Sequence, residues 1–277
     1  MLITIDTGGT KTILTAFNRE GKPGEQFRFP TPKTQTDYLS TIAGMITEHY
    51  LSKHRVIDGI VVAVPGMIRD NKVWRCANLD WAHFDIIGRL QKKLGLDTPV
   101  WIENDANLAA LSETLRLPEQ PRNSLYVTIS TGIGTGIIAD GQIDPNMAMS
   151  EGGHMLVEYD GRLREWESFA SGRAIHQTYG KLARDITNRR VWVQIADKIS
   201  RGFLALIPVV MPDIIIIGGS IGAHFDRYKE PLTHYISSQL PDYIPMPVIQ
   251  QARYPEEAVI YGCYYYGVQQ LSHPIGD

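Results

Sequence analysis

Two glycine-rich segments, one in each half of the 277-residue chain, constrain the fold most. In the first, the apolar strand pattern 2–5 is followed by Asp-Thr-Gly-Gly-Thr-Lys at positions 6–11 and by the β-branched segment 12–17. In the second, strand pattern 124–130 is followed by Thr-Gly-Ile-Gly-Thr at 131–135, strand 136–139 and the tight turn Asp140-Gly141. Small residues between two strand patterns predict a β-hairpin, so each half of the chain is expected to open with one.

After each hairpin, helical periodicity alternates with short apolar runs. The first half predicts helices at 36–50, 85–94 and 105–115 and buried strands at 59–64 and 100–102. The second half predicts a loop-rich stretch at 144–171, helices at 173–182 and 191–210, a buried strand at 214–217, a strand near Val248 and a last helix from about position 256. We therefore expect an internally duplicated α/β fold, with a boundary near 118–123, where Pro118 and Pro121 interrupt the helical pattern.

Charge and cysteine content exclude several classes of protein. The 27 basic and 30 acidic residues give a net charge of −3, which leaves no basic excess for a nucleic-acid partner. Cys76 and Cys263 are too few for a disulfide scaffold or a multi-cysteine zinc site. The most apolar run, 203–217, is interrupted by Pro208, Pro212 and Asp213, so it is too short to span a membrane. The first residues, Met1–Asp6, show no secretory signal. We therefore expect a cytoplasmic protein without a membrane partner.

The two predicted turns suit phosphate groups. Their glycines let backbone N–H groups approach a phosphate, Lys11 adds a charged donor, and Asp6 can orient a hydrated magnesium ion. A P-loop is excluded because the spacing before Lys11 is wrong, and a dinucleotide fingerprint is excluded because strand and not helix follows the second turn. Plain hairpin turns remain the alternative for both segments.

Three further segments carry candidate chemistry. Asp105, at a strand-to-helix boundary, could accept a proton from a substrate hydroxyl while Asn104 binds a neighbouring hydroxyl; helix N-capping is the alternative. Glu151 and His154, in Glu-Gly-Gly-His, and Glu167 are groups that bind vicinal sugar hydroxyls, or else solvated loop residues. Strand 214–217 ends at Gly218-Gly219, which could admit a ribose or form a simple turn.

In this order, the segments resemble those of the ROK family of sugar kinases, within the actin-like ATPase superfamily. Residues 6–11 and 131–134 look like its two phosphate motifs, and Val64-Pro65-Gly66 and Asn78-Leu79 look like its sugar-side loops. Positions 103–107 are similar to the catalytic segment, 151–154 to its Glu-x-Gly-His motif, and 217–219 to its adenosine motif. Glu167 matches the glutamate before the family's Ala-Ser-Gly. The resemblance covers nearly the whole chain.

The resemblance implies a duplicated actin-like (ribonuclease H-like) fold with two lobes around a nucleotide and sugar cleft, and a homodimer. The small lobe would comprise 1–118 and the C-terminal helix 256–272, and the larger lobe 119–255. It also implies the role of each site residue: Asp105 as general base; Asn78, Asn104, Glu151, His154, Glu167 and Gly66 on the sugar; Gly8, Gly9, Thr10, Lys11, Thr131, Gly132, Gly218 and Gly219 on the nucleotide; and Asp6 on Mg²⁺ through water.

One departure from the family concerns zinc. ROK proteins usually carry a cysteine-rich zinc knuckle after the Glu-x-Gly-His motif, whose histidine is the fourth ligand. Here the stretch 155–166 contains no cysteine and is several residues short, so no zinc site is expected. His154 must then be held by another group, for which Glu158 and Tyr159 are the candidates.

The function that the resemblance implies is an ATP- and Mg²⁺-dependent hexose kinase, with glucose O6 as the first expectation. Alternatives within the class are fructose, mannose or an N-acetylhexosamine as acceptor and polyphosphate as donor. A sugar-responsive repressor is a rival from another class, but its helix-turn-helix would precede the first phosphate motif, which here begins at Asp6. A binding-only protein is disfavoured because Asp6, Asp105 and both glycine turns are present.

Overall fold

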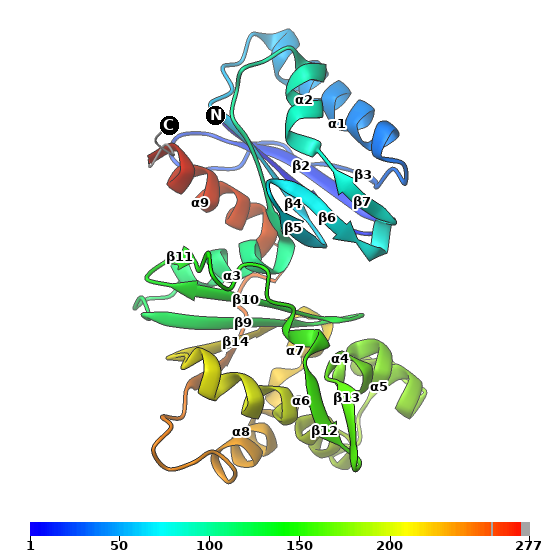
Figure 1. Ribbon diagram of the computed structural model, residues 1–277, viewed down its shortest axis with the longest axis vertical. Helices are drawn as coiled ribbons and strands as arrows, with labels where there is room; N and C mark the ends of the chain where they lie inside the picture. The colour runs from blue at the N-terminus through cyan, green and yellow to red at the C-terminus, as the bar shows by residue number, and fades with distance from the viewer. Residues whose placement is uncertain (256, 273–277) are drawn as a thin grey trace. The chain divides into compact units, whose positions relative to one another are not determined.

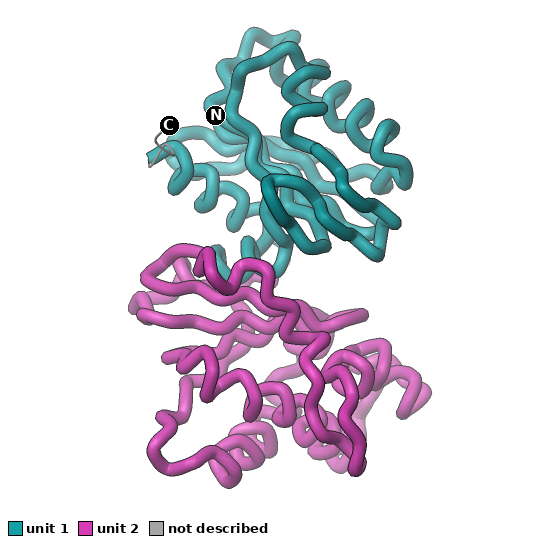
Figure 2. The backbone as a smooth tube through the Cα atoms, in the orientation of Figure 1, with its two compact units in different colours: residues 1–112, 257–277 teal, residues 113–256 magenta. Residues whose placement is uncertain are grey.

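The computed structural model describes residues 1–255 and 257–272. It divides the chain into two compact units, Met1–Ser112 with Glu257–Asp277 and Glu113–Glu256 (Figure 2). The division falls within helix α3 (Asp105–Leu115), a few residues before the proline-containing segment at which the sequence predicts a boundary. Helix α9 (Ala258–Ser272) belongs to the first unit.

Unit 1 is built on a mixed five-stranded sheet in the order β3-β2-β1-β4-β8. The β1–β2 pair is the predicted hairpin, antiparallel from Leu2 opposite Phe17 to Thr7 opposite Thr12. Strands β1, β4 and β8 are parallel, so their carboxyl ends meet at one edge of the sheet. The strands are β1 (Leu2–Thr7), β2 (Lys11–Phe17), β3 (Phe27–Pro30), β4 (Gly59–Val64) and β8 (Val100–Asn104).

Helices cover both faces of this sheet (Figure 1). Helix α1 (Gln35–His49) and α2 (Ile86–Leu94) share a core with the side chains of one face, including Ile3 and Ile5. Helix α9 packs on the other face, where Ile260 contacts Phe17. Successive side chains of a strand point to opposite faces of the sheet. Because helices cover both faces here, a central strand such as β4 is apolar at nearly every position.

A small antiparallel sheet in unit 1 was not predicted from the sequence. It consists of β5 (Met67–Arg69), β6 (Lys72–Cys76) and β7 (Trp81–Phe84). Asp70 and Asn71, both with positive φ, form the turn between β5 and β6. A short 3₁₀ turn, Ala77–Leu79, joins β6 to β7 and carries Asn78.

Unit 2 repeats the architecture with its own five-stranded sheet, in the order β11-β10-β9-β14-β15. When the strands of each five-stranded sheet are ranked by their order in the chain, both sheets have the same spatial order, 3-2-1-4-5. The predicted internal duplication is therefore confirmed. Strand β10 begins at Ile133, three positions before the predicted strand, which shortens the second glycine turn. The strands are β9 (Asn123–Ile129), β10 (Ile133–Ala139), β11 (Gln142–Ile143), β14 (Ile214–Gly218) and β15 (Val248–Gln251).

The long helix α6 (Arg189–Val210) packs with α8 (Lys229–Ser237) against one face of this sheet, in a core that includes Phe203 and Ile215. Three short helices complete the unit: α4 (Glu167–Ala170), α5 (Gly172–Tyr179) and α7 (Gly219–Gly222). The predicted loop-rich stretch 144–171 was partly wrong, because it contains an antiparallel hairpin of β12 (Leu156–Tyr159) and β13 (Arg162–Glu165).

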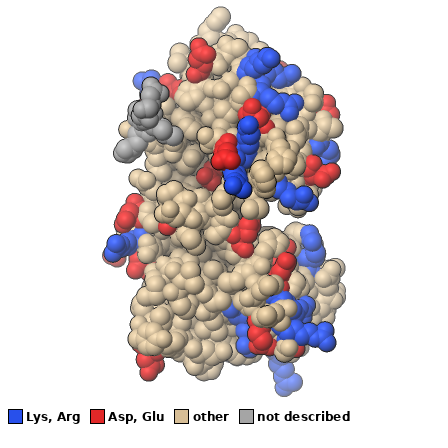
Figure 3. Space-filling view, viewed as in Figure 1, with Lys and Arg blue, Asp and Glu red and all other residues tan. Residues whose placement is uncertain are grey.

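Two surface properties are relevant to partners. On the face drawn in Figure 3, Lys and Arg side chains are interspersed with Asp and Glu side chains. Within the described residues, no helix has the length and apolar character needed to cross a membrane.

Candidate functional site

The first glycine turn, between β1 and β2, has its carbonyl groups held and two N–H groups available. The Gly8 N–H donates to Lys11 O at 2.9 Å. The Thr31 hydroxyl donates to Gly8 O at 2.7 Å, and Lys33 Nζ donates to Gly9 O at 2.8 Å. The N–H groups of Gly9 and Thr10 make no hydrogen bond to any described residue. The turn can therefore offer adjacent backbone donors to an anion.

Asp6 lies near the carboxyl end of β1, next to this turn. It is paired with Ala63 of β4 and is partly buried. Burial raises the pKa of Asp6 to about 6, against the opposing effect of Lys11. A carboxylate with a raised pKa gains from a nearby cation, because a cation stabilises its charged form.

Asn104 and Asp105 lie where β8 ends and α3 begins. Asn104 Oδ1 accepts the N–H groups of Ala106 and Asn107, at 2.8 and 3.2 Å, and Asn104 Nδ2 donates to Gly66 O at 3.1 Å. Asp105 Oδ1 accepts the Ala106 N–H at 2.9 Å. Asn104 therefore caps α3, and its amide oxygen is engaged by the helix, whereas Asp105 accepts only the N–H of the residue that follows it.

Glu103 supports this segment, a role that the sequence analysis did not assign. Its Oε1 accepts the Asn104 N–H at 2.7 Å and Asn107 Nδ2 at 3.0 Å. Burial raises the pKa of Glu103, against the effect of these hydrogen bonds. Hydrogen bonds on both sides of the β8–α3 junction fix its backbone, and they thereby fix the direction of the Cα–Cβ bond of Asp105.

Gly66 lies next to Asn104, and Asn78 lies near the first glycine turn. A Cβ on Gly66 would come within 2.5 Å of Arg75 O, so only glycine allows the β4–β5 loop to pack against β6.

Burial raises the pKa of the Cys76 thiol, and the nearby Asp105 raises it further. Asn78 Cβ would lie 3.5 Å from a Cβ on Gly9. A pocket of about 550 Å³ beside Asn78 is lined by Lys33, Thr34, Gln35, Ala77, Asn78, Leu79, Asp80 and Trp81.

The second glycine turn, between β9 and β10 in unit 2, is organised by Ser130, which the sequence analysis did not single out. The Ser130 N–H donates to Gly132 O at 2.9 Å. Ser130 O accepts the Gly172 N–H at 2.7 Å, and its hydroxyl oxygen accepts the Ser220 N–H at 3.0 Å. This one residue ties the turn to the first residues of α5 and to α7. Thr131 stays exposed.

Glu167 contacts the same turn. Its Oε2 accepts the Ile133 N–H at 2.7 Å, and a Cβ on Gly132 would come within 2.2 Å of that oxygen. Gly218 lies against the Tyr126 hydroxyl, and Gly219, with φ of +79°, lies against Ile129 O. The structure thus brings Thr131, Gly132, Glu167 and the glycines of β14–α7 together at one end of the unit 2 sheet.

His154 ends a short 3₁₀ turn, Gly152–His154, which packs against β10. Its Nδ1 lies 3.2 Å from Glu165 Oε2. The prediction that Glu158 or Tyr159 holds His154 was wrong: Glu158 accepts the Gly161 N–H at 2.7 Å, and Tyr159 stacks on Phe169. Both side chains are committed to folding the β12–β13 hairpin, whose existence was not foreseen.

Carboxylates surround this imidazole. The hydrogen bond to Glu165 raises the pKa of His154, and Glu167 and Glu151 raise it further. Burial raises the pKa of Glu151, with opposing effects from His154 and Glu167. Within residues 1–255 and 257–272, no group of three or more His, Cys, Asp or Glu side chains is arranged to hold a metal ion. The cluster is suited to polar hydroxyl groups.

Both the sequence and the fold of this chain are similar to those of known proteins. A sequence model described as ROK family matches residues 2–268. The fructokinase of Pediococcus pentosaceus is 26% identical over 274 residues, which cover 85% of this chain and 91% of that protein. The N-acetylmannosamine kinase of Vibrio cholerae serotype O1 is 30% identical over 272 residues, which cover 89% and 92%.

Solved structures agree with the architecture. A ROK family glucokinase from Streptomyces griseus, in complex with glucose and AMPPNP, superimposes with a TM-score of 0.78 at 22% identity, covering 97% of this chain and 99% of that one. The inorganic polyphosphate/ATP-glucomannokinase of Arthrobacter sp. strain KM gives a TM-score of 0.73 at 29% identity, covering 97% and 98%. The predicted actin-like ATPase fold is confirmed.

Proposed function

Because this chain belongs to the ROK family and is a sugar kinase, we propose that it transfers the γ-phosphoryl group of ATP to a hexose, with glucose O6 as the acceptor. The observation that carries this proposal is the position of Asp105. Asp105 is the first residue of α3, where β8 ends at the carboxyl edge of the unit 1 sheet, and it follows Asn104, whose amide donates to Gly66 O. A carboxylate at such an edge is well placed to act on a bound ligand.

In unit 1, we assign Asp105 as the general base that accepts the proton of the attacking sugar hydroxyl. Asn78 and Gly66 bind the sugar, and Asn104 contributes the amide hydrogen that does not bond Gly66 O. The N–H groups of Gly9 and Thr10, with Lys11 and the Gly8 turn, bind phosphate oxygens. Phosphoryl transfer depends on such positioning and charge neutralisation more than on covalent chemistry.

In unit 2, we assign Glu151, His154 and Glu167 to sugar hydroxyls. The exposed Thr131 and Gly132 bind phosphate oxygens, and Gly218 and Gly219 bind the adenosine. Glu167 binds Ile133 N–H through one carboxylate oxygen, so it couples the position of a sugar ligand to that of the phosphate turn.

The residues of unit 1 fit the magnesium ion that such a kinase requires. Asp6 is a single, partly buried carboxylate with a raised pKa beside the phosphate turn. A single carboxylate is enough for Mg²⁺, which is bound mainly by water and nucleotide phosphates. When bound, the ion would neutralise charge on the phosphates, and Asp6 would orient it through water.

Substitution of Asp105 tests the assigned base. We expect Asp105→Asn to lower kcat by about 10²–10⁴-fold, because the carboxylate that accepts the proton is lost. Sugar binding, measured by calorimetry, should change little, because the amide oxygen can still accept the Ala106 N–H. Asp85→Asn is the matched control, since Asp85 caps α2 and asparagine caps equally well. Turnover near the wild-type rate in Asp105→Asn would refute the assignment.

Acceptors and donors other than glucose and ATP form the second candidate activity. The names of the relatives favour it, because they include a fructokinase, an N-acetylmannosamine kinase and a glucomannokinase that uses polyphosphate or ATP. A coupled assay with glucose, fructose, mannose and N-acetylmannosamine, each with ATP and with polyphosphate, separates these possibilities. The highest kcat/KM identifies the substrate pair.

A further inference from the structure

We propose that Glu165 is a positioning residue, which holds His154 Nδ1 so that Nε2 is left to bind a sugar hydroxyl. The proposal rests on the sugar kinase function proposed above. Glu165 ends β13 and lies opposite Leu156, the first residue of β12, so it stands at the open end of the hairpin. His154 lies two residues before that end, and its ring nitrogen lies 3.2 Å from Glu165 Oε2.

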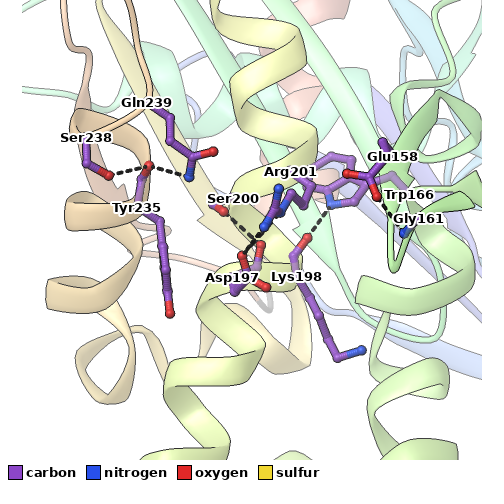
Figure 4. Close-up of polar contacts among 10 residues, drawn as sticks. All are labelled: Glu158, Gly161, Trp166, Asp197, Lys198, Ser200, Arg201, Tyr235, Ser238 and Gln239. Atoms are coloured by element: carbon purple, nitrogen blue, oxygen red, sulfur yellow. Dashed lines mark hydrogen bonds and ion pairs between the residues drawn. The ribbon is translucent and has the colours of Figure 1, made fainter. Parts of the chain in front are cut away.

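The hairpin that carries Glu165 is closed by a tight turn. Asp160 and Gly161 have φ values of +54° and +72°, the conformation of a type I′ turn. The Glu158 carboxylate accepts the Gly161 N–H and reinforces this turn (Figure 4). At the open end, the Trp166 N–H donates to Met155 O at 2.9 Å and continues the pairing of the strands.

The hairpin is also anchored to helix α6. Trp166, next to Glu165 in sequence, is fully buried, and its Nε1 donates to Lys198 O at 3.2 Å (Figure 4). Tyr159 stacks on Phe169 with ring centroids 4.3 Å apart, and Lys198 Nζ lies 4.5 Å from the centre of the Tyr159 ring. These contacts hold both ends of the hairpin, and with them the backbone of Glu165, while the paired Glu165 and His154 side chains are each about half exposed.

A carboxylate at Nδ1 determines what the other ring nitrogen can do. It stabilises the tautomer with a proton on Nδ1, which leaves Nε2 as an acceptor for a hydroxyl group when the ring is neutral. When the ring is protonated, Nε2 becomes a donor. The charged groups that face this imidazole are Glu165, Glu167 and Glu151. Glu165 is the one that makes the hydrogen bond and is not assigned to the sugar.

Two variants of Glu165 test the proposal, with Glu158→Gln as the matched control on the same hairpin. We expect Glu165→Ala to raise the KM for the sugar by about tenfold, with the KM for ATP unchanged, because loss of such a supporting group typically costs 10–100-fold. Glu165→Gln should have a smaller effect, since its amide oxygen still accepts from Nδ1. In an NMR titration, the His154 ring should titrate at lower pH in both variants than in the wild type. Glu158→Gln should match the wild type in each measurement.

An unchanged His154 titration in Glu165→Gln, or an unchanged sugar KM in a folded Glu165→Ala, would overturn the proposal. If Glu165→Ala does not fold, the titration and the sugar KM of Glu165→Gln decide instead. Failure of the proposed function would look different, because the wild type would then phosphorylate no sugar. In that case, the NMR titration still shows whether Glu165 holds His154. An unchanged His154 titration in Glu165→Gln would reject that role for Glu165.

Discussion

Gly132 shows how a residue without a side chain can leave room for a neighbouring carboxylate, that of Glu167. Its Cα lies so close to Glu167 that any Cβ would collide with the Oε2 that accepts the Ile133 N–H. Sequence reasoning attributed the glycine to phosphate binding and Glu167 to the sugar. It could not connect them, because they are distant in sequence and only the folded chain brings them together.

We predict that Gly132→Ala raises the sugar KM by about tenfold and lowers the melting temperature. The displaced carboxylate leaves the Ile133 N–H without its partner, which costs about 1–3 kcal/mol. Gly44→Ala is the matched control: it lies in α1 with nothing within 4 Å of a new Cβ, so it should stabilise the helix slightly and leave KM unchanged. Equal kinetics in the two variants would exclude the coupling of Glu167 to the turn.

The charged carboxylate of Asp6 lowers the stability of the folded protein, although the proposed magnesium site needs that charge. Its pKa rises from 3.8 to about 6 on folding, so the folded state favours the protonated form and loses stability as pH rises between these values. Asp6→Asn should therefore stabilise the protein at pH 7.5 by about 3 kcal/mol, have little effect at about pH 4, and abolish activity.

Urea unfolding at both pH values measures this difference. Asp58→Asn is the control with the opposite sign, since the N-terminal amine lowers the pKa of Asp58 and its charged form stabilises the fold above the unfolded pKa. A constant difference between Asp6→Asn and the wild type across the pH range would show that Asp6 does not titrate as described.

At the scale of elements, the β12–β13 hairpin is the largest departure from the sequence prediction. The Asp160-Gly161 dipeptide that forms its turn is the same signal that correctly indicated the Asp140-Gly141 turn. It was missed because the flanking strands are only four residues each and expose Leu156 and Leu163, so they lack a clear alternation. The sequence shows no cysteine in this stretch, but it did not reveal that the stretch forms a hairpin.

Packing between this hairpin and α6 gives a prediction at the same scale. A Cβ on Gly202 would come within 2.1 Å of the Trp166 ring, so Gly202→Ala should cost about 1–3 kcal/mol although alanine favours helix. Because Trp166 lies between Glu165 and Glu167, the sugar KM should rise as well. Denaturant unfolding and steady-state kinetics measure both effects. Unaltered stability in Gly202→Ala would contradict this account of the packing.

For the whole molecule, the duplicated topology was predictable because the sequence of each unit begins with a glycine hairpin and continues with buried apolar strands. Helices such as α2 and α3 were predicted closely, since Asp85 caps the first and apolar periodicity marks both. The sequence could propose site residues by their chemical type, but it could not predict the contacts that support them. Ser130, Lys33 and Glu165 act through contacts with residues distant in sequence, which no local pattern reveals.

We propose that this chain phosphorylates a hexose on a hydroxyl whose proton Asp105 accepts. ³¹P NMR of the wild type incubated with glucose, ATP and Mg²⁺ tests this reaction. We expect a new sugar monophosphate resonance, that of glucose 6-phosphate, to grow in step with ADP, and to grow about 10²–10⁴-fold more slowly with Asp105→Asn. ATP consumption without any sugar phosphate, or the same product from Asp105→Asn at the wild-type rate, would contradict the account.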